Sequence, residues 1–536
     1  MNSQMIRAMA PAMAAIVAIG AIVGALLLLH FPLYTDEVQW KALGSRLFLD
    51  NFSLNYLFPA CTAGFIQPVP ISWWPSRLID ATIYSNAGNP LMIRYIGIAT
   101  YFAIWAGIGW IIHRLWRDIP LWICISVALG LTSFGMLTPL LVMNRPEQGI
   151  LVPFLVIVGI YLVSRERTEL PGQARSWLYC LVLGLLVWLM LGAHLKSFVL
   201  LPIAILAAAA AIRRRWPMIV FVFASGFAFY ENYRLWATRT DCPASPYLEA
   251  QFAYLSLSPK LLLADPARFL SQSLADLERS LAYFGNAWVR SNGYPSHWWP
   301  TGPASAFDNI SNLAFSALAL VLICLCLWGA VRYAVRYAVR GWGQAPRPNA
   351  AITFWLTLGL LAFMIYQITK NFYETSLVWP LLVLAAIFAL KDRGPWLAKA
   401  TIFALPVLTI FMLIAQFALV TRVWPHLDEW NAAASSQDAR QQQIIDLAAN
   451  CHTTVAPEQA GLVVDDFAYS VFWPTKRPMF NSYFYGPWST GLDHAATVTA
   501  LDLKAEIAKC TEIPEQYRSE AQRSADQSYC CVHFSS

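Results

Sequence analysis

Long apolar blocks separated by short polar connections dominate the first 420 residues of the chain. Runs of roughly 18 or more apolar residues are long enough to cross a bilayer as helices. They predict about eleven transmembrane helices, at residues 9–29, 91–113, 119–137, 149–163, 177–192, 198–212, 218–233, 310–333, 351–368, 375–390 and 401–420. The first run is too long for a cleaved signal peptide, so we expect it to stay as a span. The pattern predicts a mainly α-helical, polytopic membrane protein.

Two segments between the predicted spans are too long to be simple connections. Residues 31–90 are rich in aromatic residues and proline, and we expect them to lie along the membrane surface. Residues 234–308 contain two amphipathic stretches, at 261–263 and 269–281. The sequence therefore predicts one transmembrane domain, 1–420, with two long extracytoplasmic loops.

The tail after the last predicted span, residues 421–536, is richer in charge and is able to build a small core of its own. Its spacing predicts a helix around 437–447, strands at 461–464 and 468–472, and a helix over 495–510. We expect a small extracytoplasmic α/β domain.

Charge is scarce, and its distribution predicts the orientation. Only 13% of residues are charged and 58% are hydrophobic, against about 25% charged in soluble domains, which excludes a soluble enzyme, a disordered protein and a nucleic-acid binder. Basic clusters such as Arg213–Arg215 follow apolar runs, as in cytoplasmic loops. We expect a cytoplasmic N-terminus and an extracytoplasmic tail.

Cysteine placement agrees with an oxidising outer compartment. Six of the ten cysteines lie outside the predicted spans, namely Cys61, Cys242, Cys451, Cys510, Cys530 and Cys531. Their connectivity stays open, but a bond from Cys451 to Cys510, or to Cys530 or Cys531, closes the tail. The spacings do not match a structural zinc site.

Four groups of polar and charged residues adjoin span ends on the predicted outer side. They are Tyr34–Glu37, Asn144–Gln148, His194–Ser197 and Lys370–Glu374. Ionisable residues at membrane depth are costly and normally functional. Structural explanations stay open for three of the groups: a helix cap at the first, a helix start at the second and a snorkelling lysine in the third.

The ordered motifs "YTDEVQW", "NRPEQG" and "HLKSFVLLP" resemble those of GT-C glycosyltransferases, which take sugars from polyprenyl-phosphate donors. The chain looks similar to bacterial lipid A aminoarabinose transferases and protein O-mannosyltransferases. It lacks a WWDYG-like signature in the tail, and Trp73-Trp74 is followed by Pro75, so an oligosaccharyltransferase is disfavoured.

The resemblance implies a role for each candidate residue. Asp36 is the expected catalytic base, and Glu37 positions the acceptor or helps to hold a divalent cation, Mg²⁺ or Mn²⁺, if one is used. The expected donor-phosphate ligands are Arg145, Lys196 and His194, and the expected substrate contacts are Glu147, Lys370, Tyr373 and Glu374.

The same resemblance implies a protein of the bacterial inner membrane with a periplasmic C-terminal domain, and an inverting transfer on the periplasmic face. The expected partners are a polyprenyl-phosphate sugar, a lipid or cell-envelope glycan acceptor such as lipopolysaccharide, and membrane lipids, but no nucleic acid.

Two other functions use similar features. A flippase or transporter for a lipid-linked sugar needs many spans, but transporters tend to have inverted repeats and ionisable residues near the membrane midplane. An O-antigen polymerase or ligase shifts attention to residues 234–308 and His297. Charges at span ends and the lack of an evident repeat favour the glycosyltransferase.

Overall fold

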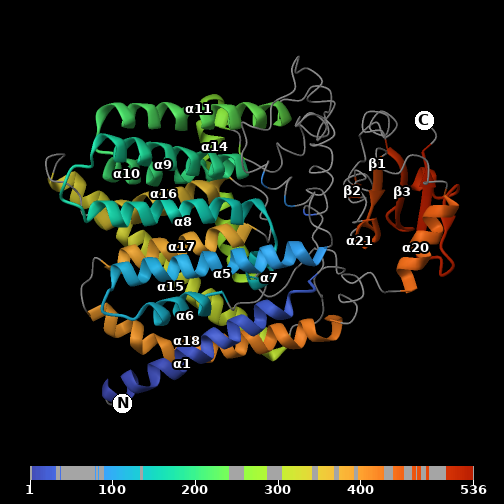
Figure 1. Cartoon of the computed structure of the whole chain (residues 1–536), viewed down its shortest axis with the longest axis horizontal. Helices are drawn as coiled ribbons and strands as arrows, with labels where there is room; N and C mark the ends of the chain where they lie inside the picture. The colour runs from blue at the N-terminus through green and yellow to red at the C-terminus, as the bar shows by residue number, and fades with distance from the viewer. Residues whose placement is uncertain are drawn as a thin grey trace.

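The computed structural model describes residues 3–31, 37, 79, 83, 90–132, 137–240, 257, 259–286, 305–340, 348–366, 374–391, 396–427, 439–451, 461–465, 467–472, 479–481 and 503–534. Helices of the first 427 residues form one bundle (Figure 1). They are α1 (Ser3–Leu27), α5 (Pro90–Leu115), α6 (Leu121–Gly130), α7 (Leu137–Val142), α8 (Pro146–Arg165), α9 (Gln173–Ala193), η2 (Leu195–Leu200), α10 (Leu201–Ala211), α11 (Arg215–Thr240), α13 (Pro259–Ala264), α14 (Pro266–Asn286), α15 (Ala306–Arg340), α16 (Pro348–Tyr366), α17 (Thr375–Lys391), α18 (Trp396–Val423) and η4 (Trp424–His426).

Seven helices among the described residues are long and apolar enough to cross a membrane: α1, α5, α8, α9, α15, α16 and α18. Shorter apolar helices occur at Leu121–Gly130, Leu195–Ala211 and Thr375–Lys391. The structure therefore confirms a polytopic helical membrane protein, while the count of eleven spans stays a prediction. The amphipathic stretches expected within 234–308 are helices α13 and α14.

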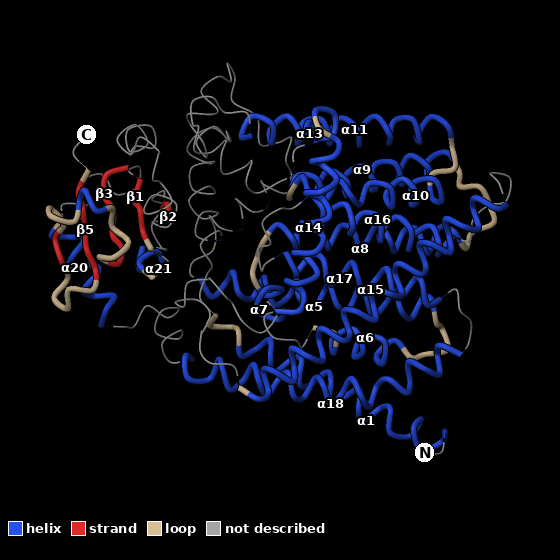
Figure 2. Tube along the Cα trace, turned by 180° about the vertical axis from the view of Figure 1, so that it is seen from behind, coloured by secondary structure: helices blue, strands red, loops and turns tan. Residues whose placement is uncertain are grey.

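Helix α17 lies in the centre of the bundle, between α8 and α15 (Figures 1 and 2). Every residue from Thr375 to Ala389 is buried, which explains why this segment is apolar on all sides. At the edge of the bundle, α1 packs closely against α18 because Gly20 and Gly24 leave room for Met412 and Gln416.

The continuous helix predicted over 119–137 is not found, because α6 ends at Gly130. Side chains satisfy the backbone at this break: Trp379 Nε1 donates to Leu131 O (2.9 Å), and Thr138 Oγ1 donates to Thr132 O (2.9 Å). Irregular backbone at membrane depth is tolerated where protein groups bond to it. After the break, the short helix α7 leads directly into the NRPEQG motif.

The C-terminal residues form a five-stranded sheet with strand order β2-β1-β3-β5-β4. Its strands are β1 (Gly461–Val464), β2 (Met479–Asn481), β3 (Leu503–Lys509), β4 (Gln522–Arg523) and β5 (Tyr529–His533), and its helices are α20 (Ala439–Asn450), α21 (Ala468–Phe472) and η6 (Glu515–Tyr517). Strands β2, β1 and β3 run parallel, while β5 and β4 are antiparallel to their neighbours. Apolar residues of α20 and of one sheet face share a core.

Two predicted elements of the tail are wrong. The helix expected over 495–510 is replaced, in its described part, by strand β3, which pairs with β1 on one side and β5 on the other. This pairing outweighs the helix propensity of its Leu, Lys, Ala and Glu residues. The strand expected at 468–472 is helix α21, because Asp465 Oδ1 accepts hydrogen bonds from the backbone N–H groups of Phe467 and Ala468.

Two disulfides close the tail. Cys451, just after α20, bonds to Cys531 of β5, and Cys510, just after β3, bonds to Cys530. The sequence left open whether Cys451 bonds to Cys510 or to one of the adjacent residues Cys530 and Cys531. The second alternative is confirmed. Cys61 and Cys242 lie outside the described residues.

Candidate functional site

Glu37 is fixed by a buried arginine of the second long helix. The guanidinium of Arg94, on α5, donates from Nη1 and Nη2 to the two carboxylate oxygens of Glu37 (2.9 and 2.8 Å). Arg94 Nε also donates to Phe31 O (2.6 Å), just after α1. The exposed fractions of the Arg94 and Glu37 side chains are 1% and 0%, so a charged pair buried from solvent ties the chain after α1 to α5.

The same carboxylate reaches the second motif. Glu37 Oε1 accepts a hydrogen bond from the backbone N–H of Asn144 (3.0 Å). Gly97, one turn after Arg94, brings α5 this close to α7, because a Cβ at Gly97 would overlap the carbonyl oxygen of Val142. Glu37 is thus joined to the residue directly before Arg145.

A second buried charge cluster brings together residues of the second and third motifs. Arg145 Nε donates to Glu147 Oε2 (3.2 Å), and Lys196 Nζ bonds to Glu147 Oε1. All three side chains are buried, with exposed fractions of 4%, 1% and 6% for Arg145, Glu147 and Lys196. Because the two cations bond to the two oxygens of one carboxylate, they converge on one place from separate elements.

Local backbone structure fixes the positions of Arg145 and Lys196. Arg145 is the N-cap of α8, its backbone N–H donates to Gln148 Oε1 (3.0 Å), and Pro146 occupies the first turn. The helix start predicted from Pro146 is confirmed. His194 is extended between α9 and η2, and its Nδ1 accepts the backbone N–H of Lys196 (3.1 Å). Since Lys196 is buried, the snorkelling explanation is wrong.

All these residues lie at one end of the bundle. The end of α1, the start of α5, the start of α8 and the end of α9 lie on the side that faces the C-terminal sheet (Figure 1). We call this end the motif end. The apolar lengths of the helices separate it from the opposite end, which we call the Arg-rich end because Arg114, Arg165 and Arg213 lie there, at or just after the ends of α5, α8 and α10.

The structure describes only part of the predicted site. It brings Glu37, Arg145, Glu147, His194 and Lys196 to the motif end. Glu374 is described and buried directly before α17. Asp36, Lys370 and Tyr373 lie outside the described residues, as do Trp73, Trp74 and His297.

Sequence reasoning missed Arg94. The residue lies three positions after the start of the apolar run 91–113, inside the predicted span. A lone arginine in such a run is itself a signal, because an intramembrane charge needs a partner.

A divalent cation on Glu37 has little support from this geometry. Both carboxylate oxygens of Glu37 already accept hydrogen bonds from Arg94. Within the described part of the chain, no group of three His, Cys, Asp or Glu side chains is arranged to hold a metal.

A further buried acid lies in the C-terminal sheet. Glu506 of β3 is fully buried, and neither of its carboxylate oxygens has a hydrogen-bond partner among the described residues. Burial, followed by the nearby carboxylates of Glu512 and Asp465, raises the pKa of Glu506 well above its usual value.

Comparisons with known proteins give structural neighbours only. No protein-family model matches the chain, and no curated protein matches its sequence. The structure is similar to ArnT from Cupriavidus metallidurans, solved bound to undecaprenyl phosphate, at a TM-score of 0.48 and 12% identity over 97% of both chains. It is also similar to the oligosaccharyltransferase AglB from Archaeoglobus fulgidus, at a TM-score of 0.40 and 11% identity over 97% of this chain and 74% of that one. Both are GT-C glycosyltransferases.

Proposed function

We propose that this protein is an integral membrane glycosyltransferase that moves a sugar from a polyprenyl-phosphate-linked donor to a hydroxyl acceptor at the motif end. One observation carries the proposal: Arg145 and Lys196 come from separate elements and meet at one buried carboxylate. Two cations held at a membrane-helix end suit a phosphate whose lipid tail stays in the bilayer.

Asp36, the acidic residue directly before Glu37, is the general base. Asp36 precedes Glu37 by one peptide bond, which sets their Cα atoms about 3.8 Å apart. Glu37 is fixed to Arg94 and to the backbone of Asn144, next to Arg145. Asp36 therefore accepts the proton of the acceptor hydroxyl beside Arg145 and Lys196.

The reaction balances without a cofactor. The acceptor oxygen forms a bond to the anomeric carbon while the bond from that carbon to the phosphate oxygen breaks. The leaving polyprenyl phosphate keeps the electron pair, and Arg145 and Lys196 stabilise its added negative charge. Attack from the face opposite the phosphate inverts the anomeric centre.

The remaining residues have supporting roles in this proposal. Glu147 fixes the two cations, and His194 orients Lys196 through its backbone. Lys370, Tyr373 and Glu374 face the sugar. The motif end is periplasmic, and the acceptor is a lipid or cell-envelope glycan.

The test separates chemistry from binding. Undecaprenyl phosphate is the probe for binding to the detergent-solubilised full chain, measured by native mass spectrometry, while sugar transfer is followed in membranes by glycan analysis. Asp36→Asn is expected to bind the probe normally and to abolish transfer. Arg145→Gln and Lys196→Met are expected to weaken probe binding about tenfold or more.

Arg175→Gln is the matched control, because Arg175 is exposed at the opposite end of α9. Full transfer activity in Asp36→Asn would show that Asp36 is not the catalytic base. Unchanged probe binding in both Arg145→Gln and Lys196→Met would show that these residues do not bind the phosphate, and would favour a transporter.

A further inference from the structure

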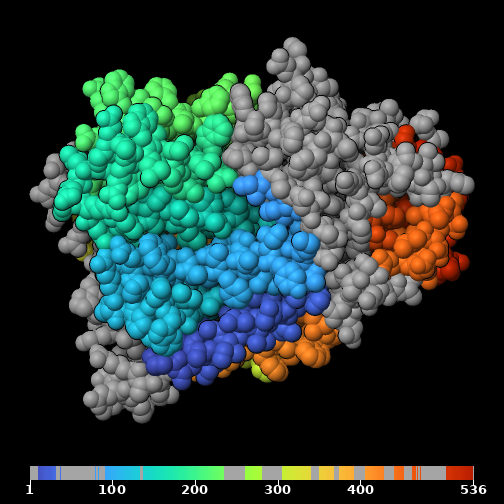
Figure 3. Space-filling view, in the orientation of Figure 1, coloured from blue at the N-terminus to red at the C-terminus, as the bar shows by residue number. Residues whose placement is uncertain are grey.

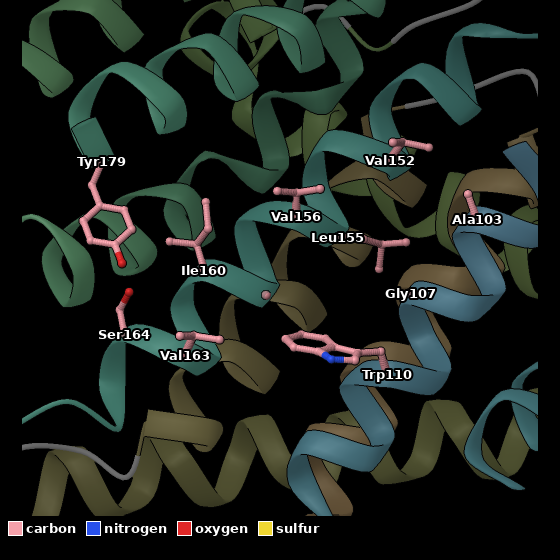
Figure 4. Close-up of a pocket in the computed structure, with 11 residues that line it drawn as sticks. Ala103, Gly107, Trp110, Val152, Leu155, Val156, Ile160, Val163, Ser164 and Tyr179 are labelled. Atoms are coloured by element: carbon pink, nitrogen blue, oxygen red, sulfur yellow. The ribbon is translucent and has the colours of Figure 1, made fainter. Parts of the chain in front are cut away.

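An open groove of about 500 Å³ lies between α5, α8 and α9 (Figure 4). It is lined almost wholly by apolar side chains, among them Trp110, Val152 and Val156, together with Ser164 and Tyr179 at one end. Its volume falls within the range of about 300–1,000 Å³ that proteins use for small ligands.

The groove opens to the surroundings of the bundle. Val152 and Val156 on its rim are 37% and 46% exposed, and the α5, α8 and α9 segments form one outer face (Figure 3). Because α5, α8 and α9 are all apolar enough to span a membrane, the medium at this face is lipid hydrocarbon.

The length of the groove along α8 matches the thickness of one bilayer leaflet. From Val152 to Ser164, α8 rises about 18 Å at 1.5 Å per residue. Half of the bilayer hydrocarbon is about 15 Å thick. One straight acyl chain therefore fits the groove from mid-membrane to the Arg-rich end.

That end carries polar groups suited to a lipid headgroup. Ser164 lines the groove and is buried, and its hydroxyl has no hydrogen-bond partner among the described residues. It points toward the hydroxyl of Tyr179 (Figure 4), which accepts a hydrogen bond from Arg167 Nη1 (2.9 Å). Arg213 Nη2 donates to the carbonyl oxygen of Ser164 (3.1 Å), so two guanidinium groups border this end of the groove.

We infer that the groove binds one acyl chain of an anionic glycerophospholipid from the leaflet at the Arg-rich end. The chain lies along Val156 and Trp110, the Ser164 hydroxyl donates to an ester carbonyl oxygen, and Arg167 and Arg213 face the phosphate. Charge complementarity at this end selects an anionic headgroup over a zwitterionic one.

The groove is distinct from the proposed donor site. Ser164 lies 19 residues along α8 from Arg145, or about 28 Å. A donor phosphate on Arg145 and Lys196 therefore sits at the opposite membrane surface. The inference does not depend on the proposed catalytic activity.

The experiment uses phosphatidylglycerol with a photoreactive acyl chain, incorporated with the full-length protein into phosphatidylcholine nanodiscs, and maps the crosslinked peptides. Crosslinks are expected within 103–110 and 152–164. Val156→Trp, which fills the groove, should lower their yield about tenfold. Leu181→Trp is the matched control, because Leu181 is 70% exposed on α9 and does not line the groove; it should leave the yield unchanged.

Ser164→Ala tests the polar end without changing the shape of the groove, and should lower the yield about three- to tenfold. Unlabelled phosphatidylglycerol should compete at least severalfold better than phosphatidylcholine with the same chains. Equal competition by the two lipids, an unchanged yield in Val156→Trp, or stronger competition by undecaprenyl phosphate would each overturn the inference.

Discussion

The buried pair of Arg94 and Glu37 gives the sharpest test of how the site is held together. Arg94→Met keeps an unbranched apolar stem but leaves a carboxylate of 0% exposure without its guanidinium. Removing one partner of a buried pair costs about 3–5 kcal/mol, because the other charge stays desolvated. The variant also loses the bond to Phe31 O, which anchors the chain after α1.

A double-mutant cycle isolates the pair. Glu37→Gln alone leaves the guanidinium buried. The double variant removes both charges, and the amide oxygen that replaces the carboxylate still accepts the Asn144 N–H. The double variant should therefore be more stable than the sum of the single variants predicts, with a coupling of about 2 kcal/mol. Unfolding free energies come from SDS titration in mixed micelles.

The matched control is Arg117→Met at the Arg-rich end. Arg117 pairs with Glu166 in a bridge whose side chains are 60% and 36% exposed, so its loss should cost less than about 1 kcal/mol. Two results would refute this reasoning. One is a loss of unfolding free energy in Arg94→Met as small as that in Arg117→Met, and the other is a coupling below about 0.5 kcal/mol.

Three further outcomes follow from other parts of the molecule. Gly97→Ala should lower the free energy of unfolding by about 1–3 kcal/mol in the same titration, because its Cβ overlaps Val142 O, while Gly184→Ala, in open space, should not. Glu506→Gln should raise the thermal unfolding midpoint of the C-terminal domain at pH 7 and flatten its pH dependence. The raised pKa of Glu506 makes wild-type stability fall as pH rises above 4.5, and an equal slope in both proteins would contradict this. Reducing the Cys451–Cys531 bond should destabilise the domain by about 2–5 kcal/mol, measured as a lower midpoint with dithiothreitol.

Hydropathy predicted where most membrane helices lie, because burial in lipid leaves a strong compositional signal. It could not predict the break after Gly130. The break depends on Trp379, which lies 248 positions away from Leu131 in the chain and donates to its carbonyl. Periodicity within a segment carries no information about such a distant partner.

The C-terminal sheet shows the same limit of prediction from local sequence. Glu506 and its neighbours favour a helix locally, yet β3 is the central strand, held by partners on both sides. At the site, the motifs indicated Glu37, Arg145 and Lys196, but which charges pair with each other is a property of the folded bundle. Arg94, a lone charge in an apolar run, signals that a buried partner exists, but its sequence context does not identify Glu37 as that partner.

Glu147 shows how the fold prepares the site. A cation buried from water without a counter-charge costs several kcal/mol, so Arg145 and Lys196 could not both be held at the membrane interface on their own. The carboxylate between them offsets that cost and fixes both before any ligand arrives. Electrostatic catalysis is most effective when the stabilising charges need no rearrangement during the reaction. In the proposed reaction Glu147 therefore positions the two cations and does not contact the sugar, and Arg145 and Lys196 act as one unit whose single substitutions do not add.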